Sequence, residues 1–219
     1  MEKQQLIDEI REWKEKKDAV ILAHYYVDDD VQAIADYVGD SYFLAKAAMK
    51  EKKSMICFAG VKFMGESAKI LNPEKTVVMP DGLADCAMAH MVDIEKIKQV
   101  RAEYEDLAVA CYINSTAEIK SYSDVCVTSA NALKIIKALP QKNIFFIPDE
   151  NLGRYIASQV PEKKFIFNDG YCPVHKAMTA EEVKKAKEEH EDAEVLVHPE
   201  CTMDVIAMGD YIGSTSGII

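Results

Sequence analysis

The chain alternates short apolar runs with segments in which apolar residues recur at helical spacing. The predicted strands are residues 19–23, 54–59, 75–79, 107–111, 143–147, 164–167 and 195–197. The predicted helices are residues 2–17, 32–37, 41–49, 61–71, 93–105, 129–139, 151–159 and 179–190. Short apolar runs without polar alternation are typical of parallel strands that are buried on both faces. The alternation of strands and helices along the whole chain therefore predicts an α/β fold with parallel sheets.

One pattern occurs three times along the chain. In each copy a residue with a polar group ends an apolar run, an aspartate follows twelve positions later, and a hydroxyl residue comes five positions after that. The three sets are His24, Asp36 and Ser41; Tyr112, Asp124 and Ser129; and His198, Asp210 and Thr215. The repeat predicts three related α/β units, residues 1–85, 86–171 and 172–219, of which the third is incomplete. We expect these units to surround a pseudo-threefold axis.

The strand ends carry a second recurring position two residues further on, occupied by Tyr26, Asn114 and Glu200. Residues at i and i+2 of an extended segment project to the same side, and ligands of open α/β sheets bind at the carboxyl ends of the strands. The recurring hydroxyls are expected at helix starts, where free N–H groups favour an anion. Taken singly, these residues are ordinary strand ends and helix caps, and Ser41 is expected to be such a cap. Recurring together, they predict one central ligand cavity.

The six cysteines fall into different classes of surroundings. Cys57, Cys111 and Cys126 lie in apolar segments and are expected to be small core residues. Cys86 and Cys172 lie in polar loops at the spacing of the repeat. Three thiolates on one threefold axis would suit a [4Fe–4S] cluster with one open iron, but this chain supplies two at the repeating position. The third would follow residue 219, since Cys201 belongs to a strand-end segment.

Composition excludes several classes of partner. The formal net charge is −11 and basic residues form only short helix faces, so we expect no nucleic-acid partner. No apolar run approaches the roughly 18 residues that span a bilayer, so we expect no membrane insertion. The charged N-terminal segment lacks the apolar core of a signal peptide, which predicts a cytoplasmic protein.

The motifs of the repeat resemble those of the quinolinate synthase family over the whole length of the chain. They are AHYY at 23–26, GDS at 39–41, Cys86, YINS at 112–115, TSAN at 128–131, CPVH at 172–175, HPEC at 198–201 and GSTSGI at 213–218. The resemblance implies a transferase of NAD biosynthesis with three related three-layer α/β/α domains around a [4Fe–4S] cluster, held by one cysteine from each domain. Such an enzyme condenses iminoaspartate with dihydroxyacetone phosphate to quinolinate, releasing phosphate and water. The iminoaspartate could be handed over transiently by the oxidase or dehydrogenase that makes it.

The resemblance also implies roles for particular residues. The cluster ligands in this chain would be Cys86 and Cys172. The catalytic residues would be Tyr26, Tyr112, His198 and Glu200, with Glu200 as general acid or base. The residues lining the substrate pocket would be His24, Ser41, Tyr112, Asn114, Ser129, His198, Glu200, Ser214 and Thr215.

Two functions of other classes remain open at this point. A zinc-binding module could use Cys86, His90, Cys172 and His175, whose spacing is compatible with a Cys₂His₂ site. A non-catalytic relative could bind a dicarboxylate or a phosphorylated metabolite through the recurring hydroxyls alone.

Overall fold

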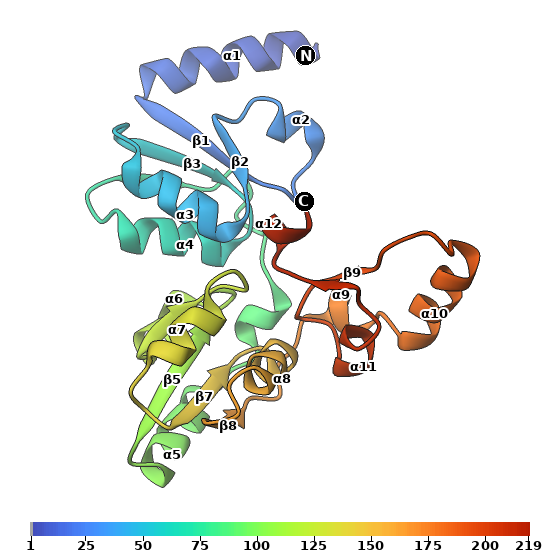
Figure 1. The fold of residues 1–219 in the computed structure, drawn as a ribbon. Helices are drawn as coiled ribbons and strands as arrows, with labels where there is room; N and C mark the ends of the chain where they lie inside the picture. Colours follow the sequence, from blue (N-terminus) through green and yellow to red (C-terminus); the bar gives the residue numbers. More distant parts are fainter. Residues whose placement is uncertain (1) are drawn as a thin grey trace. The chain divides into compact units, whose positions relative to one another are not determined.

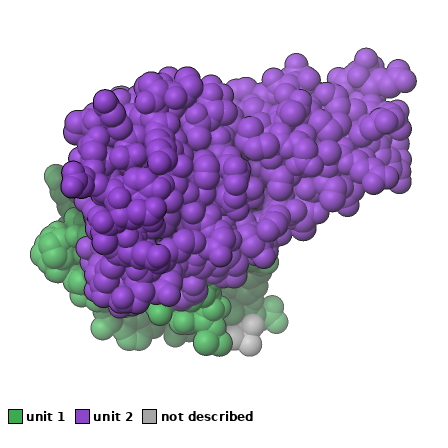
Figure 2. Space-filling model, turned by 90° about the horizontal axis from the view of Figure 1, so that it is seen from below, with its two compact units in different colours: residues 1–86 green, residues 87–219 purple. Residues whose placement is uncertain are grey.

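The computed structural model describes residues 2–219, which divide into two compact units on either side of the Cys86–Ala87 bond. We call the segment up to residue 86 unit 1 and residues 87–219 unit 2; they are coloured separately in Figure 2. No helix in the described part of the chain is long and apolar enough to span a bilayer.

Unit 1 is built on a parallel sheet of four strands in the order β2-β1-β3-β4. Helix α1 lies on one face of the sheet and helices α3 and α4 on the other (Figure 1). The elements of unit 1 are α1 (Lys3–Lys16), β1 (Ala19–His24), α2 (Asp29–Gln32), β2 (Tyr37–Gly39), α3 (Ser41–Lys50), β3 (Met55–Ala59), α4 (Lys62–Leu71) and β4 (Thr76–Val78).

Unit 2 contains a second four-stranded parallel sheet, in the order β6-β5-β7-β8, and a small parallel sheet formed by β9 and β10. Tyr155 of helix α8 packs against the apolar cluster under the small sheet, which holds the two sheets of unit 2 together. The elements are η1 (Ala87–His90), α5 (Ile94–Glu103), β5 (Leu107–Tyr112), α6 (Ala117–Ser121), β6 (Val125–Val127), α7 (Ala132–Ala138), β7 (Asn143–Ile147), α8 (Glu150–Ser158), β8 (Lys164–Phe167), α9 (Pro173–Lys176), α10 (Ala180–Glu189), β9 (Leu196–Val197), α11 (Met203–Ile206), β10 (Tyr211–Ile212) and α12 (Thr215–Ile218).

The α/β class with parallel sheets is confirmed. Strands β1 and β5 are central in their sheets, and all six residues of each are buried, which is why both read as continuous apolar runs. On one face of the second sheet, Val109 and Phe145 pack against Ile97 and Val100 of α5.

The repeat is visible in the strand pairing. Leu22 pairs with Tyr37 in unit 1, and the residues 88 positions later, Ala110 and Val125, pair in the same way. In the third copy Leu196 pairs with Tyr211, which shows the same register 86 positions on. The division of residues 87–219 into a second and a third repeat unit stays a prediction.

The recurring aspartates hold the fold together and do not face a ligand site. Each carboxylate accepts a backbone N–H from the strand that it follows, and each forms an ion pair with a basic residue of the preceding helix. The N–H donors are Ile21 to Asp36 at 2.8 Å, Val109 to Asp124 at 2.7 Å and Val195 to Asp210 at 2.9 Å. The ion pairs are Lys14 with Asp36 at 2.6 Å, Arg101 with Asp124 at 2.9 Å and Lys187 with Asp210 at 3.1 Å.

Some sequence predictions are wrong. The helix expected at residues 32–37 is the earlier helix α2, which begins at Asp29 and ends at Gln32 because the side chain of Asp28 caps its start. Tyr37 begins strand β2 instead. The edge strands β2, β6 and β10 were not predicted, since each has only two or three residues. Cys126, expected in the core, is exposed on edge strand β6, and Cys57 is half-buried.

Candidate active site

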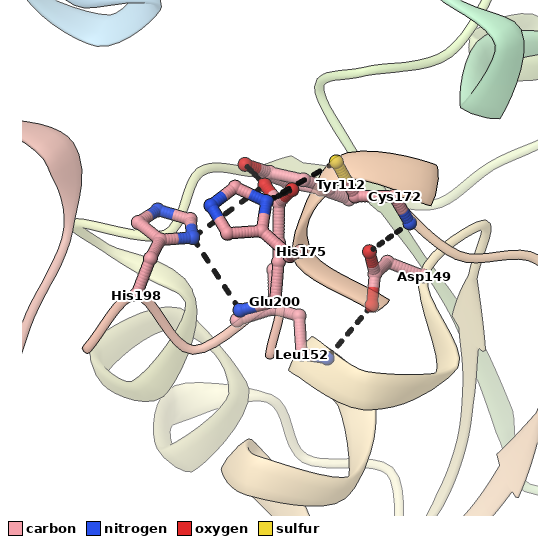
Figure 3. Close-up of polar contacts among 7 residues, drawn as sticks. All are labelled: Tyr112, Asp149, Leu152, Cys172, His175, His198 and Glu200. Atoms are coloured by element: carbon pink, nitrogen blue, oxygen red, sulfur yellow. Dashed lines mark hydrogen bonds and ion pairs between the residues drawn. The ribbon is translucent and has the colours of Figure 1, made fainter. Parts of the chain in front are cut away.

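Five side chains of unit 2 converge where strand β5, helix α9 and the turn after β9 meet: Tyr112, Cys172, His175, His198 and Glu200 (Figure 3). Tyr112 is the last residue of β5, and Cys172 and His175 lie on the single turn of α9. His198 and Glu200 lie in a turn closed by a hydrogen bond from the Cys201 N–H to the His198 carbonyl at 3.0 Å. Strand ends therefore deliver most of this cluster, as the repeat predicted.

The carboxylate of Glu200 is the centre of the cluster. Its side chain is buried, with 4% of the residue exposed. Oε1 accepts the phenol hydrogen of Tyr112 at 2.5 Å, and Oε2 lies 3.0 Å from Nδ1 of His175. Burial opposes ionisation, but the hydrogen bond from His175 and the charge of its imidazolium outweigh burial, so the pKa of Glu200 is lowered. Glu200 is therefore a carboxylate at neutral pH.

His175 is the cationic partner of this carboxylate. Burial acts to lower its pKa, but hydrogen bonds to the Cys172 sulfur and to Glu200 raise the pKa of His175 to about 10. Nδ1 lies 3.1 Å from Cys172 Sγ, so the same nitrogen faces a thiol and a carboxylate. The His175–Glu200 pair joins a half-buried imidazolium to a buried carboxylate, and a shifted pair of this kind makes a candidate functional site.

Tyr112 keeps its phenol proton. Burial, the charge of Glu200 and the hydrogen bond to it all raise the pKa of Tyr112, while an interaction with the Ser129 hydroxyl acts in the opposite direction. Tyr112 is thus a donor toward Glu200, and Ser129 lies beside it. Ser129 was expected to start a helix but lies in the turn before α7, which begins at Ala132.

The strand-end histidines His24 and His198 share one hydrogen-bond arrangement. Nδ1 of His24 accepts the backbone N–H of Tyr26 at 3.2 Å, and Nδ1 of His198 accepts that of Glu200 at 3.4 Å. Burial lowers the pKa of both histidines, that of His24 to about 4. Each imidazole is therefore neutral at neutral pH, with its hydrogen on Nε2.

The Nε2 atom of His198 is a candidate donor to a ligand. Its Nε2 atom is buried and has no hydrogen-bond partner among residues 2–219. Buried polar atoms in folded proteins are almost always paired, so an unpaired donor beside an ion pair indicates a ligand-binding position. The His198 ring stacks on His175 with centroids 4.9 Å apart, which fixes the direction in which Nε2 points.

Unit 1 carries its own group of predicted residues at the end of β1. His24 is buried, Tyr26 is 73% exposed, and their rings meet edge to face with centroids 4.5 Å apart. Ser41 is the first residue of α3, but the prediction that it caps the helix is wrong. The cap is Asp40, whose Oδ1 accepts the N–H of Phe43 at 2.7 Å.

The remaining predicted residues of unit 2 lie in turns. Asn114 is half-buried in the loop after β5. Ser214 is the N-cap residue of α12 and Thr215 its first residue, and the Ser214 hydroxyl lies 3.3 Å from that of Ser216.

Asp149 was not predicted from the sequence. It is completely buried, accepts the N–H of Leu152 at 2.8 Å, and accepts the N–H of Cys172 at 3.2 Å (Figure 3). Burial and the nearby charge of Glu200 raise the pKa of Asp149 to about 7. The repeat could not reveal Asp149, because the corresponding position of the first copy is Val61; the available signal was an Asp directly after a strand and before a helix.

The thiol of Cys172 fits the role of a metal ligand. It is half-buried, and its sulfur lies 3.1 Å from Nδ1 of His175. Cysteine sulfur is the usual ligand of iron–sulfur clusters. Cys86, the last residue of unit 1, is also half-buried. Cys201 fits poorly, since burial raises the pKa of its thiol to about 11.

Comparison with known proteins identifies the family of the chain. Residues 8–219 match the family described as quinolinate synthetase A protein. The quinolinate synthase of Fusobacterium nucleatum subsp. nucleatum is 60% identical over 212 residues, which cover 97% of this chain and 71% of the relative. That of Clostridioides difficile (strain 630) is 53% identical, covering 96% and 69%. That of Alkaliphilus metalliredigens is 47% identical over 219 residues, covering 100% and 72%. The chain therefore belongs to the quinolinate synthase family of enzymes.

Proposed function

We propose that this protein condenses iminoaspartate with dihydroxyacetone phosphate to form quinolinate, phosphate and water, a step of NAD biosynthesis. The observation that carries the proposal is the hydrogen-bonded Tyr112–Glu200–His175 chain, which joins the end of β5, the turn after β9 and helix α9 in a member of the quinolinate synthase family. The reaction requires imine–enamine and keto–enol interconversions, and each of these needs a proton to be removed from carbon and returned elsewhere.

Glu200 and His175 supply the two halves of such a transfer. The Glu200 carboxylate is ionised and can accept a proton from a substrate carbon, while the His175 imidazolium can return a proton to nitrogen or oxygen. Tyr112 holds Oε1 of Glu200, which leaves Oε2 on the side of His175. The neutral His198 donates its Nε2 hydrogen to a substrate oxygen and thereby polarises it.

Recognition of the two carboxylates and the phosphate is assigned to short polar side chains near helix starts and strand ends, where backbone N–H groups are also available. Tyr26 of unit 1 is assigned to proton relay, and His24 to binding and polarisation. The proposed anion-binding residues are Ser41, Asn114, Ser129, Ser214 and Thr215.

Cys86 and Cys172 are proposed as two of the cysteine ligands of a [4Fe–4S] cluster. A cluster with one iron free of cysteine supplies a Lewis acid that can polarise a carbonyl or a leaving hydroxyl. The position of Cys172 supports this assignment, because its half-buried sulfur lies within 4.8 Å of ligand atoms of His175 and Glu200.

Iminoaspartate is an imine and hydrolyses in water. We therefore propose that the oxidase or dehydrogenase that forms it works in the same compartment, the cytoplasm, and hands it over through a transient encounter.

The test compares Glu200→Gln with Glu194→Gln in an anaerobic assay of quinolinate formation, after reconstitution with iron and sulfide. Glu194 is exposed on the same segment and serves as the matched control. Parent and Glu194→Gln are expected to form quinolinate at similar rates, and Glu200→Gln about 10²–10⁴-fold more slowly. If Glu200→Gln forms quinolinate at the parental rate, the role assigned to Glu200 is wrong. If the reconstituted parent forms no quinolinate, the proposed activity is wrong.

A further inference from the structure

Three ligand atoms of different chemistry meet within unit 2. Sγ of Cys172, Nδ1 of His175 and a carboxylate oxygen of Glu200 all lie within 4.8 Å of one another. Nδ1 of His175 is 3.1 Å from the sulfur and 3.0 Å from Oε2. We propose that these three side chains form a mononuclear site for a divalent transition-metal cation of the Zn²⁺ type, which competes with the iron–sulfur cluster for Cys172.

The spacing of the three atoms suits a tetrahedral cation. Bonds of about 2.3 Å to sulfur and about 2.0–2.2 Å to nitrogen or oxygen place the ligand atoms of a tetrahedral zinc site roughly 3.3–3.8 Å apart. The two His175 distances are a few tenths of an ångström shorter than this. All three ligand atoms lie within 4.8 Å of one another. A cation therefore needs an adjustment of the three side chains, with His175 moving outward from its two partners.

The local fold presents the ligands together. Cys172 caps α9 and His175 lies three residues later on its single turn, so both side chains fall on the same side of that turn. Glu200 reaches the same point from the turn after β9. Two segments about 25 residues apart in sequence thus close the site within unit 2.

Each ligand is supported by a further contact, as in established metal sites. Oε1 of Glu200 is held by the Tyr112 phenol, and the His175 ring stacks on His198. The backbone N–H of Cys172 is fixed by Asp149. These contacts set the directions of the carboxylate, the imidazole and the Cys172 loop.

The donor types select the class of metal. One thiolate, one imidazole and one carboxylate suit Zn²⁺ and similar transition-metal ions, whereas Mg²⁺ and Ca²⁺ prefer oxygen ligands alone. Three protein ligands leave a fourth position for water or for a substrate oxygen.

This ligand set differs from the Cys₂His₂ alternative considered for the sequence. The proposed site uses Glu200 beside Cys172 and His175, whereas the Cys₂His₂ site would use Cys86 and His90 beside them. His90 lies exposed in the η1 turn. Because one thiolate cannot serve both metals in this way, zinc bound here blocks cluster assembly at Cys172.

The test is a titration of the metal-free chain with Co²⁺, which reports thiolate ligation through a sulfur-to-cobalt charge-transfer band in the near ultraviolet. We expect one equivalent to bind with this band, and Zn²⁺ to displace it. Cys172→Ser is expected to remove the band, and Glu200→Gln to weaken binding at least about tenfold. Cys86→Ser and Glu194→Gln are the matched controls and are expected to bind like the parent.

The outcomes that overturn the proposal are the absence of stoichiometric Co²⁺ binding, loss of the band in Cys86→Ser, and parental affinity in Glu200→Gln. X-ray absorption of the zinc-loaded parent decides the matter without any variant, since the site predicts one sulfur in the first shell and a Cys₂His₂ site predicts two. These readouts do not depend on quinolinate formation, so failure of the proposed activity would leave them unaffected. Conversely, Glu200→Gln should still take up the iron–sulfur cluster.

Discussion

Two buried imidazoles show how single residues are prepared for ligand binding. In His24 and His198 a backbone N–H occupies Nδ1, so the neutral ring must carry its hydrogen on Nε2. The arrangement needs only the residue two positions on, so it recurs wherever the repeat places a histidine at the end of a strand. Desolvation then keeps the rings neutral at the pH where carboxylate and phosphate ligands are ionised.

The neutrality of His24 has a measurable consequence for stability. Its pKa in the folded protein is about 4, against an ordinary value of 6.5, because burial outweighs the favourable charge of Asp40. Between these two pH values the unfolded chain binds a proton that the folded chain does not, so stability falls as the pH drops from 7 to 4. The shift corresponds to a loss on the order of 3 kcal/mol.

We expect His24→Gln to remove this part of the pH dependence. As the pH is lowered from 7 to 4, the free energy of unfolding of the parent should fall by more than that of the variant. Urea unfolding followed by the fluorescence of Trp13, the single tryptophan of the chain, reports on unit 1. His190→Asn, which removes an exposed histidine at the end of α10, is the control. Parallel pH profiles for the parent and His24→Gln would contradict the assignment.

At the residue scale, three of the residues that the repeat marks lie together in unit 2. Tyr112, His198 and Glu200 stand at recurring strand-end positions, and the structure brings them together. Asp149 lies outside the repeat, and the role of His175 depends on a contact with Glu200 that is 25 positions away. Contacts of this kind depend on how α9 and the turn after β9 pack, which no local pattern encodes.

At the scale of elements, the recurring aspartates each join a helix to the strand that follows it. Asp124 accepts the N–H of Val109 with the same oxygen that pairs with Arg101. The two contacts differ in value, since a backbone N–H without a partner costs about 1–3 kcal/mol, whereas a half-exposed ion pair contributes about 0–1 kcal/mol.

Asp124→Ala is therefore expected to lower the free energy of unfolding of unit 2 by about 1–3 kcal/mol, and Arg101→Met by less than about 1 kcal/mol. Urea unfolding followed by far-ultraviolet circular dichroism measures both variants. The account of the aspartates is wrong if Arg101→Met costs as much as Asp124→Ala.

Two helix glycines at equivalent positions of the repeat lie against different neighbours. A Cβ on Gly153 of α8 would come within 3.0 Å of the ring of Phe146, which is buried, and 3.2 Å of that of Phe167. A Cβ on Gly65 of α4 would meet the thioether of Met79 at 2.5 Å, and this flexible side chain can move aside.

We expect Gly153→Ala to destabilise unit 2 by about 1–2 kcal/mol, because overpacking of about 1–3 kcal/mol exceeds the helix-propensity gain of up to about 1 kcal/mol. Gly65→Ala should be close to neutral. Unfolding by circular dichroism for the first variant and by Trp13 fluorescence for the second provides the comparison. Equal effects at the two positions would show that the aromatic neighbours do not limit the space at Gly153.

The central elements of each sheet could be predicted from the sequence, and the edges could not. Strands β1, β5 and β7 are buried and read as continuous apolar runs. The edge strands β2, β6 and β10 are short and partly exposed, so their sequences resemble loops.

At the scale of the whole molecule, one strand order and one register are used repeatedly, and the chemistry is placed at the ends of the repeated strands. The copies share their structural contacts, such as the aspartates, while the strand-end residues differ between histidine and tyrosine. Substitution at these positions allows one scaffold to provide neutral donors in one copy and a phenol in another.

The proposed activity depends on Cys172 as a ligand of an iron–sulfur cluster. Anaerobic determination of iron and sulfide after reconstitution tests this most directly, with Cys172→Ser compared with Cys201→Ser. We predict about four irons and four sulfides per chain for the parent and for Cys201→Ser, and loss of both in Cys172→Ser. A parent that takes up neither element, or a Cys172→Ser variant that takes up as much as the parent, would contradict the account.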